Sequence, residues 1–256
     1  MNRIGPYRLI RPLEPVRGWE RFIALHEGND TDHLVYRHPP LHDGAERRRL
    51  LALIAPVATV RHPHLLEVTA YSLDEQDRLC LVTPYTGNQE GLVTLADLVE
   101  RKNGRLEVAE VARCVEHLLS AIAEARRGGL ADGPIDADRV QVDRRGSVRI
   151  ELYGLPAADR RFRGVCTAAD EVRAIAEMAV WLLTGLRQDV APVGIARIAG
   201  RGARAWEPWL QAALDPLGGF ETPEEALAAL PTRSDDVPIP EVVVTPHATR
   251  LAGVLR

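Results

Sequence analysis

The character of the sequence changes near residue 84, and this change limits the folds that the chain can adopt. Short runs rich in β-branched and aromatic residues, bounded by turn residues, lie at residues 6–14, 21–26, 33–38, 65–71 and 78–83. One amphipathic helical pattern, at residues 43–60, interrupts these runs after the third. The rest is mostly helical, with one alternating hairpin pattern at residues 140–152. The sequence therefore predicts an α+β protein.

The amino-acid composition limits the classes of function that we expect for this protein. Hydrophobic residues make up 46% of the 256 residues and charged residues 27%, as in an ordinary folded protein. The net charge of −4 argues against a nucleic-acid or membrane-surface partner, because both favour a basic protein face. Of the 32 basic side chains, Lys102 is the only lysine, so chemistry that requires a lysine has one candidate.

The cysteines and the apolar stretches indicate in which cellular compartment the protein is expected. The three cysteines lie far apart, without the spacing of a zinc site or a disulfide framework, and indicate a reducing compartment. No signal-peptide pattern is visible, and the longest apolar stretch is too short to span a bilayer. We therefore expect a cytoplasmic protein with no membrane insertion within this chain.

Several local motifs occur in an order that resembles the bacterial Ser/Thr protein kinases. Tyr7–Leu13 is similar to their opening strand, and Arg61–Leu66 (RHPHLL) is similar to the junction after their regulatory helix. Leu79–Tyr85 is similar to the strand that enters the hinge between the kinase lobes, and Thr94–Leu98 to the helix beyond it. Leu182–Gly185 (LLTG) resembles the end of their central helix. The ordered series, more than any single motif, carries the resemblance.

The resemblance covers about residues 5–231 and implies a protein kinase-like two-lobed fold. The N-lobe, residues 1–83, is then an antiparallel β-sheet with one helix. The C-lobe, residues 84–231, is mainly α-helical around the central hairpin at residues 140–152. Residues 232–256 are polar and proline-bearing at their start, and we predict a linker and C-terminal tail there.

The same alignment indicates that the nucleotide-binding elements are altered. Glu14, Val16 and Trp19 occupy the three positions of the glycine-rich loop that covers the phosphates in active kinases. The position of the strand lysine falls on Arg37, which keeps the positive charge but has a planar, forked head group.

The catalytic and metal-binding elements also differ. The HRD positions fall on Asp132, Gly133 and Pro134, and proline offers no side-chain base. The metal-binding Asn position holds Arg139, and the DFG aspartate position holds Leu152, which cannot bind Mg²⁺ because this ion prefers oxygen ligands. The resemblance thus implies a degenerate member, a pseudokinase, with no catalytic residue and no metal ligand.

The expected function is that of a protein-interaction or regulatory scaffold, whose partner is another protein, such as a true kinase or its substrate. No cofactor is expected, although weak, metal-independent binding of an adenine nucleotide stays open. Such a site would use Arg37 and the hinge residues Pro84, Tyr85 and Thr86, because hinge contacts to adenine are made by the backbone.

Two alternatives remain at this point. One is a residual or unconventional ATP-dependent phosphotransferase, which would use Arg37 with carboxylates such as Asp132, Asp136 or Asp138. The other is a sensor of nucleotides or small molecules, which would bind them in the former nucleotide cleft of the kinase-like fold.

Overall fold

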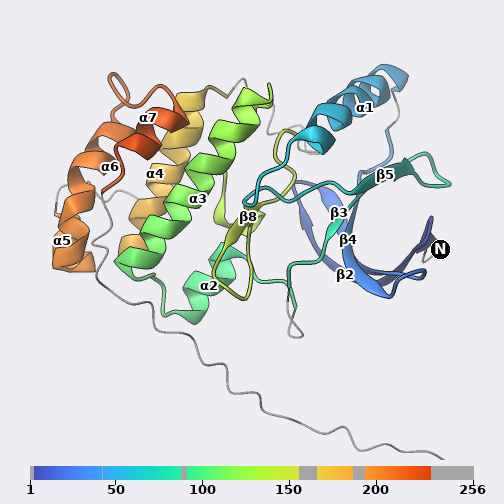
Figure 1. Ribbon diagram of the computed structural model, residues 1–256, viewed down its shortest axis with the longest axis horizontal. Helices are drawn as coiled ribbons and strands as arrows, with labels where there is room; N and C mark the ends of the chain where they lie inside the picture. The colour runs from blue at the N-terminus through green and yellow to red at the C-terminus, as the bar shows by residue number, and fades with distance from the viewer. Residues whose placement is uncertain (1–2, 42, 88–90, 156–165, 187–193, 232–256) are drawn as a thin grey trace, which may run out of the picture.

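The computed structural model describes residues 3–41, 43–87, 91–155, 166–186 and 194–231, and it places them in two lobes (Figure 1). The N-lobe contains one antiparallel sheet in the order β1-β2-β3-β4-β6-β5. Its elements are β1 (Arg3–Ile4), β2 (Tyr7–Val16), β3 (Trp19–His26), β4 (Thr31–Arg37), α1 (Gly44–Thr59), β5 (Ala70–Leu73) and β6 (Leu79–Pro84).

Both faces of the N-lobe sheet bury apolar side chains, because successive strand residues point in opposite directions. The inner face, which includes Leu34, Tyr36 and Leu81, belongs to the main hydrophobic core. The outer face, which includes Val35 and Val82, holds a small separate cluster. Whether a residue of β3 or β4 has an odd or an even number (its parity) therefore decides whether its side chain contacts the main core.

Helix α1 packs on the inner side of the sheet. Asp43 begins it by accepting a hydrogen bond from the backbone N–H of Ala45 at 2.8 Å, which satisfies one of the free donors of the first turn. Leu50, Ile54 and Val57 form its buried stripe and contact the main core.

The C-lobe is built on two long helices that pack against each other (Figure 1). Its helices are α2 (Leu95–Arg101), α3 (Val108–Arg127), α4 (Ala168–Thr184), α5 (Ile195–Ala199), α6 (Trp206–Leu214) and α7 (Pro223–Ala228), with short 3₁₀ segments η1 (Ala137–Arg139) and η3 (Arg201–Ala205). Thr167 and Asp170 cap the start of α4 reciprocally, and Gly185 ends it with φ of 76°. Strands β7 (Val140–Val142) and β8 (Val148–Ile150) form the hairpin that faces the N-lobe.

The predicted fold class is confirmed: a two-lobed α+β fold with a helical C-lobe and a central hairpin. The strand predicted at residues 65–71 is wrong over most of its length, since β5 begins only at Ala70. The backbone before it pairs with β8 instead: Leu66 N–H donates to Ile150 O, and Ile150 N–H donates to His64 O, each at 3.0 Å. These bonds attach the segment after α1 to the C-lobe hairpin.

Two short helical segments were not expected from the sequence. Helix α5 and segment η3 were missed, because their glycine-rich and arginine-rich sequence gives no clear helical periodicity. The predicted tail at residues 232–256 lies outside the described residues. Among those that the structure does describe, no helix has the length and apolarity needed to cross a membrane.

Candidate functional site in the cleft between the lobes

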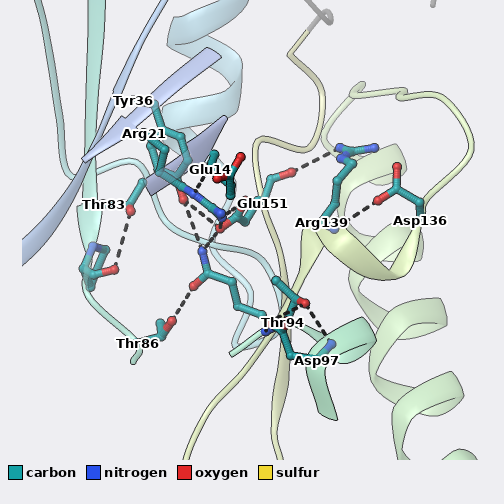
Figure 2. A network of polar contacts seen from close by, with 12 residues as sticks. Glu14, Arg21, Tyr36, Thr83, Thr86, Thr94, Asp97, Asp136, Arg139 and Glu151 are labelled. Atoms are coloured by element: carbon teal, nitrogen blue, oxygen red, sulfur yellow. Dashed lines mark hydrogen bonds and ion pairs between the residues drawn. The ribbon is translucent and has the colours of Figure 1, made fainter. Parts of the chain in front are cut away.

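A buried carboxylate, Glu151, lies between the two lobes; it directly follows β8 and is fully inaccessible to solvent. The guanidinium of Arg21, from β3 of the N-lobe, donates to both of its oxygens at 2.9 and 3.1 Å. The hydroxyl of Tyr36, from β4, donates to the same carboxylate at 3.0 Å (Figure 2). Two N-lobe strands are therefore joined to the C-lobe through one side chain.

Gln141, on β7, completes this group. Its amide nitrogen donates to Glu151 and also lies 3.2 Å from the hydroxyl oxygen of Tyr36. Its carbonyl oxygen accepts a hydrogen bond from the hydroxyl of Thr86 in the hinge. We call Arg21, Tyr36, Gln141 and Glu151 the cleft network; all four are buried, and their polar groups satisfy one another.

Burial also sets the protonation behaviour of the network. Removal from water raises the pKa of Glu151, against the opposing effect of the Arg21 charge and of the hydrogen bonds from Gln141 and Tyr36. Burial and then the adjacent Glu151 charge raise the pKa of Tyr36 well above its ordinary value. Tyr36 thus keeps its proton and acts as a donor.

A second buried group lies around Asp132, in the loop between α3 and η1. Arg17, from the turn between β2 and β3, donates to Asp132 Oδ1 at 2.7 Å and to the carbonyl of Leu155 at 2.7 Å. Arg139 donates to Asp132 Oδ2 at 2.5 Å and to the carbonyl of Glu151 at 3.1 Å. Asp132 thus holds one arginine from each lobe.

Glu171, at the start of α4, is fully buried and contacts the same loop. It accepts from Arg126 Nε at 2.6 Å, from the Tyr153 hydroxyl at 2.8 Å and from the backbone N–H of Asp132 at 3.0 Å. The carboxylate therefore ties the end of α3, the loop and the segment after β8 to one position.

The structure separates the residues predicted for a nucleotide site. Arg37 pairs with Glu20 at 2.5 Å and lies over the Phe22 ring at 4.8 Å, on the outer face of the sheet. Tyr36, one residue earlier, points to the cleft and contacts Glu151. This corrects the position that the sequence assigned to the strand cation: alternation along β4 puts Tyr36, and not Arg37, at the interface.

The three hinge residues do lie together. Pro84, at the end of β6, and Tyr85 and Thr86, which follow it, line one groove. The Thr86 hydroxyl is engaged by Gln141 of the cleft network, as described above.

At the other positions assigned from the kinase alignment, the side chains are buried or bonded within the fold. Leu152 is 3% exposed and has φ of 51°. Asp136 accepts from the backbone N–H of Arg139 at 3.0 Å as the cap of η1, and burial raises its pKa. In the part of the chain that the structure covers, no group of three or more His, Cys, Asp or Glu side chains is arranged to hold a metal ion.

Sequence reasoning missed the central residues of the site, namely Arg21, Tyr36, Gln141, Glu151 and Glu171. One signal was available: the hairpin sequence places Gln141 and Glu151 among apolar residues. A buried carboxylate needs a cationic or hydrogen-bonding partner, so Glu151 indicated a buried ion pair, although not the identity of its partner.

The two lobes, the hinge after β6, the single N-lobe helix and the hairpin at the cleft define a protein kinase-like fold. Solved structures of the Mycobacterium tuberculosis PknI kinase domain share it, and a double-mutant form superposes with a TM-score of 0.69 at 20% sequence identity, covering 88% of this chain and 95% of that one. A second structure of the same domain gives a TM-score of 0.68 at 19% identity, covering 88% and 94% of the two chains. Identity this low shows the fold alone. No protein-family model matches the sequence, and neither does any curated protein.

Proposed function

We propose that this chain is a pseudokinase, a kinase-like domain that does not transfer phosphate and acts by binding another protein. The cleft network carries the proposal. In the kinase fold, the nucleotide lies between the N-lobe sheet and the hairpin of the C-lobe, and here Arg21, Tyr36, Gln141 and Glu151 bond to one another in that place.

Electrostatics support the same conclusion. A nucleotide in the cleft would bring phosphate charge toward Glu151, and phosphates that drew Arg21 away would break the Arg21–Glu151 pair. Breaking a buried ion pair leaves an uncompensated charge, which costs about 3–5 kcal/mol, so nucleotide binding would begin from a large penalty.

The metal-dependent part of phosphate transfer lacks its usual groups. Leu152 and Arg139 stand at the two positions aligned with metal ligands, and neither side chain supplies an oxygen. Arg139 is itself held by Asp132 and by the carbonyl of Glu151, so its positive charge is fixed beside the place where a cation would bind. We propose a cytoplasmic scaffold that binds a protein, such as a true kinase or its substrate.

Thermal unfolding of the full chain tests the loss of nucleotide binding. A ligand that binds the folded state at one hundred times its Kd stabilises it by about 2.7 kcal/mol. We expect no change in Tm with millimolar ATP, with or without Mg²⁺, for the natural chain. The variant Glu20→Gln, changed at an exposed carboxylate outside the cleft, is the matched control and should behave in the same way.

A rise in Tm that requires both ATP and Mg²⁺ would overturn the proposal. It would favour the alternative of an unconventional phosphotransferase, in which Asp132, Asp136 or Asp138 acts as the base. Transfer of radiolabelled phosphate from ATP to the chain itself or to a general protein substrate would be the direct observation of that activity.

A further inference from the structure

A groove of about 440 Å³ lies between the segment after α1, the hinge and β8. We call it the hinge groove. Leu65, Leu66 and Tyr85 contribute apolar surface to it, and Arg61 and Arg149 contribute guanidinium groups. The groove thus combines an apolar lining, one aromatic ring, two arginines and the carboxylate of Glu67.

The charge of the hinge groove is positive on balance. The Arg61 side chain is 52% exposed and pairs at 2.9 Å with Glu67, which also lines the groove and offsets one of its two positive charges. Arg149 donates to the carbonyl of Pro63 at 3.0 Å and has Asp143, outside the groove, at 3.7 Å. Burial lowers the pKa of His62, which also lines the groove, and this side chain therefore stays neutral at neutral pH. The groove favours an occupant with carboxylates beside apolar side chains.

A second groove adjoins the first and contains the point where the described chain ends. It has a volume of about 480 Å³, and its lining includes His64, Leu230 and Pro231. The rings of His62 and His64, one from each groove, lie 5.4 Å apart. The chain beyond Pro231 therefore starts in the groove next to the hinge groove.

The sequence directly after Pro231 has the chemistry that the hinge groove favours. Residues 235–241 read Asp-Asp-Val-Pro-Ile-Pro-Glu, with three carboxylates around a short apolar segment. Prolines at alternate positions favour the extended polyproline II conformation, which packs well on grooves that contain aromatic side chains. Val237 lies six positions after Pro231, a stretch that can span about 20 Å when extended, so the short connection reaches across the two histidines.

We propose that residues 235–241 dock in the hinge groove of the same chain. Their carboxylates lie against Arg61 and Arg149, and their valine, isoleucine and prolines cover Tyr85 and Leu66. This contact is a feature of the chain independent of the pseudokinase proposal, because it involves neither nucleotide nor the cleft network.

The near absence of lysine from this protein makes a direct test available. In the full-length chain, Arg61→Lys and Arg149→Lys, made separately, keep the positive charge and introduce an amine that a carbodiimide can couple to a carboxylate in contact with it. We expect each variant to form an amide with Asp235, Asp236 or Glu241, identified by tandem mass spectrometry. The yield should exceed that of an undocked tail by about tenfold, because docking raises the effective concentration of the carboxylates.

Two controls distinguish docking from random encounters. Lys102, which pairs with Glu110, is a natural internal control, and Arg145→Lys places an amine on the exposed turn of the β7–β8 hairpin. Equal yields at the groove and control positions, or no tail product from the groove variants, would overturn the proposal. A further control mixes ¹⁴N- and ¹⁵N-labelled chains before coupling. Products that join the two isotopes would mean that the groove binds the tail of a second copy, and would also overturn docking within one chain.

Discussion

Two arginine–carboxylate pairs, each with its arginine on a strand of the N-lobe sheet, differ in environment far more than in geometry. The outer pair, Arg37–Glu20, has an N–O distance of 2.5 Å, and its side chains are 15% and 47% exposed. The inner pair, Arg21–Glu151, has an N–O distance of 2.9 Å, and its side chains are 9% and 0% exposed. Burial, rather than distance, should therefore decide what each pair contributes.

The two pairs also connect different parts of the molecule. Glu20 and Arg37 face each other across β3 and β4 and so join neighbouring strands of one sheet. Arg21 and Tyr36 form the next register pair, but they point to the inner face and reach Glu151 of the C-lobe. The inner pair is thus a contact between lobes, whereas the outer pair is a contact within one lobe.

The largest effect is expected from Glu151→Ala. It leaves the Arg21 charge buried without its partner and removes an acceptor from Tyr36 and Gln141, so it should destabilise the folded state by about 3–5 kcal/mol. Urea unfolding followed by circular dichroism measures this loss. Glu20→Ala, the matched change on the outer face, should cost less than about 1 kcal/mol. Equal losses would contradict the distinction between the two pairs.

A smaller effect separates the buried charge from the packing around it. The double variant Arg21→Met with Glu151→Met replaces both charges by apolar side chains, so no charge is left unpaired. It should be more stable than Glu151→Met alone by about 2 kcal/mol, because hydrophobic replacement of a whole buried pair is often nearly neutral. Comparison of the urea midpoints of the two variants checks this. A double variant no more stable than the single one would mean that Arg21 is not penalised by losing its partner.

A histidine on the inner face of the sheet should also make the stability of the protein depend on pH. His38, next to Arg37 in sequence but with the parity of Tyr36, is 7% exposed and meets the Trp19 ring edge-on at 4.7 Å. Burial lowers the pKa of His38, so the unfolded chain binds the proton more tightly. The stabilisation by His38 is therefore present above its ordinary pKa, about 6.5, and is lost as the pH falls below it.

The variant His38→Phe isolates this contribution, because it keeps an aromatic ring against Trp19 but cannot be protonated. The stability of the natural chain relative to this variant should fall between pH 7.5 and 5.5, by no more than about 1.4 kcal/mol per pH unit for one group. Urea unfolding at a series of pH values measures the difference. A difference that is constant or that grows as the pH is lowered would show that His38 is not held neutral in the fold.

The sequence was sufficient for the order of the elements but not for the contents of the cleft. Local signals such as the Thr167–Asp170 cap, the glycine after α4 and the alternation in β7 and β8 predict elements directly. The partner of Glu151 is Arg21, 130 residues away, and no local pattern encodes such a contact. Arg37 was placed in the cleft because a resemblance to a motif carries an uncertainty of one residue, which in a strand exchanges the two faces.

The smallest effect is expected from Arg37→Gln, and it tests whether the outer pair matters to the cleft at all. The change removes the partly exposed ion pair with Glu20 and the contact with the Phe22 ring, which together should contribute about 1 kcal/mol. Salt should reduce even this difference, because at 1 M ionic strength charges are screened over about 3 Å. Urea unfolding at 0.1 M and 1 M NaCl makes the comparison. A loss as large as that of Glu151→Ala, unaffected by salt, would mean that the exposed pair supports the fold as strongly as the buried one, and burial would no longer explain the difference between the two faces.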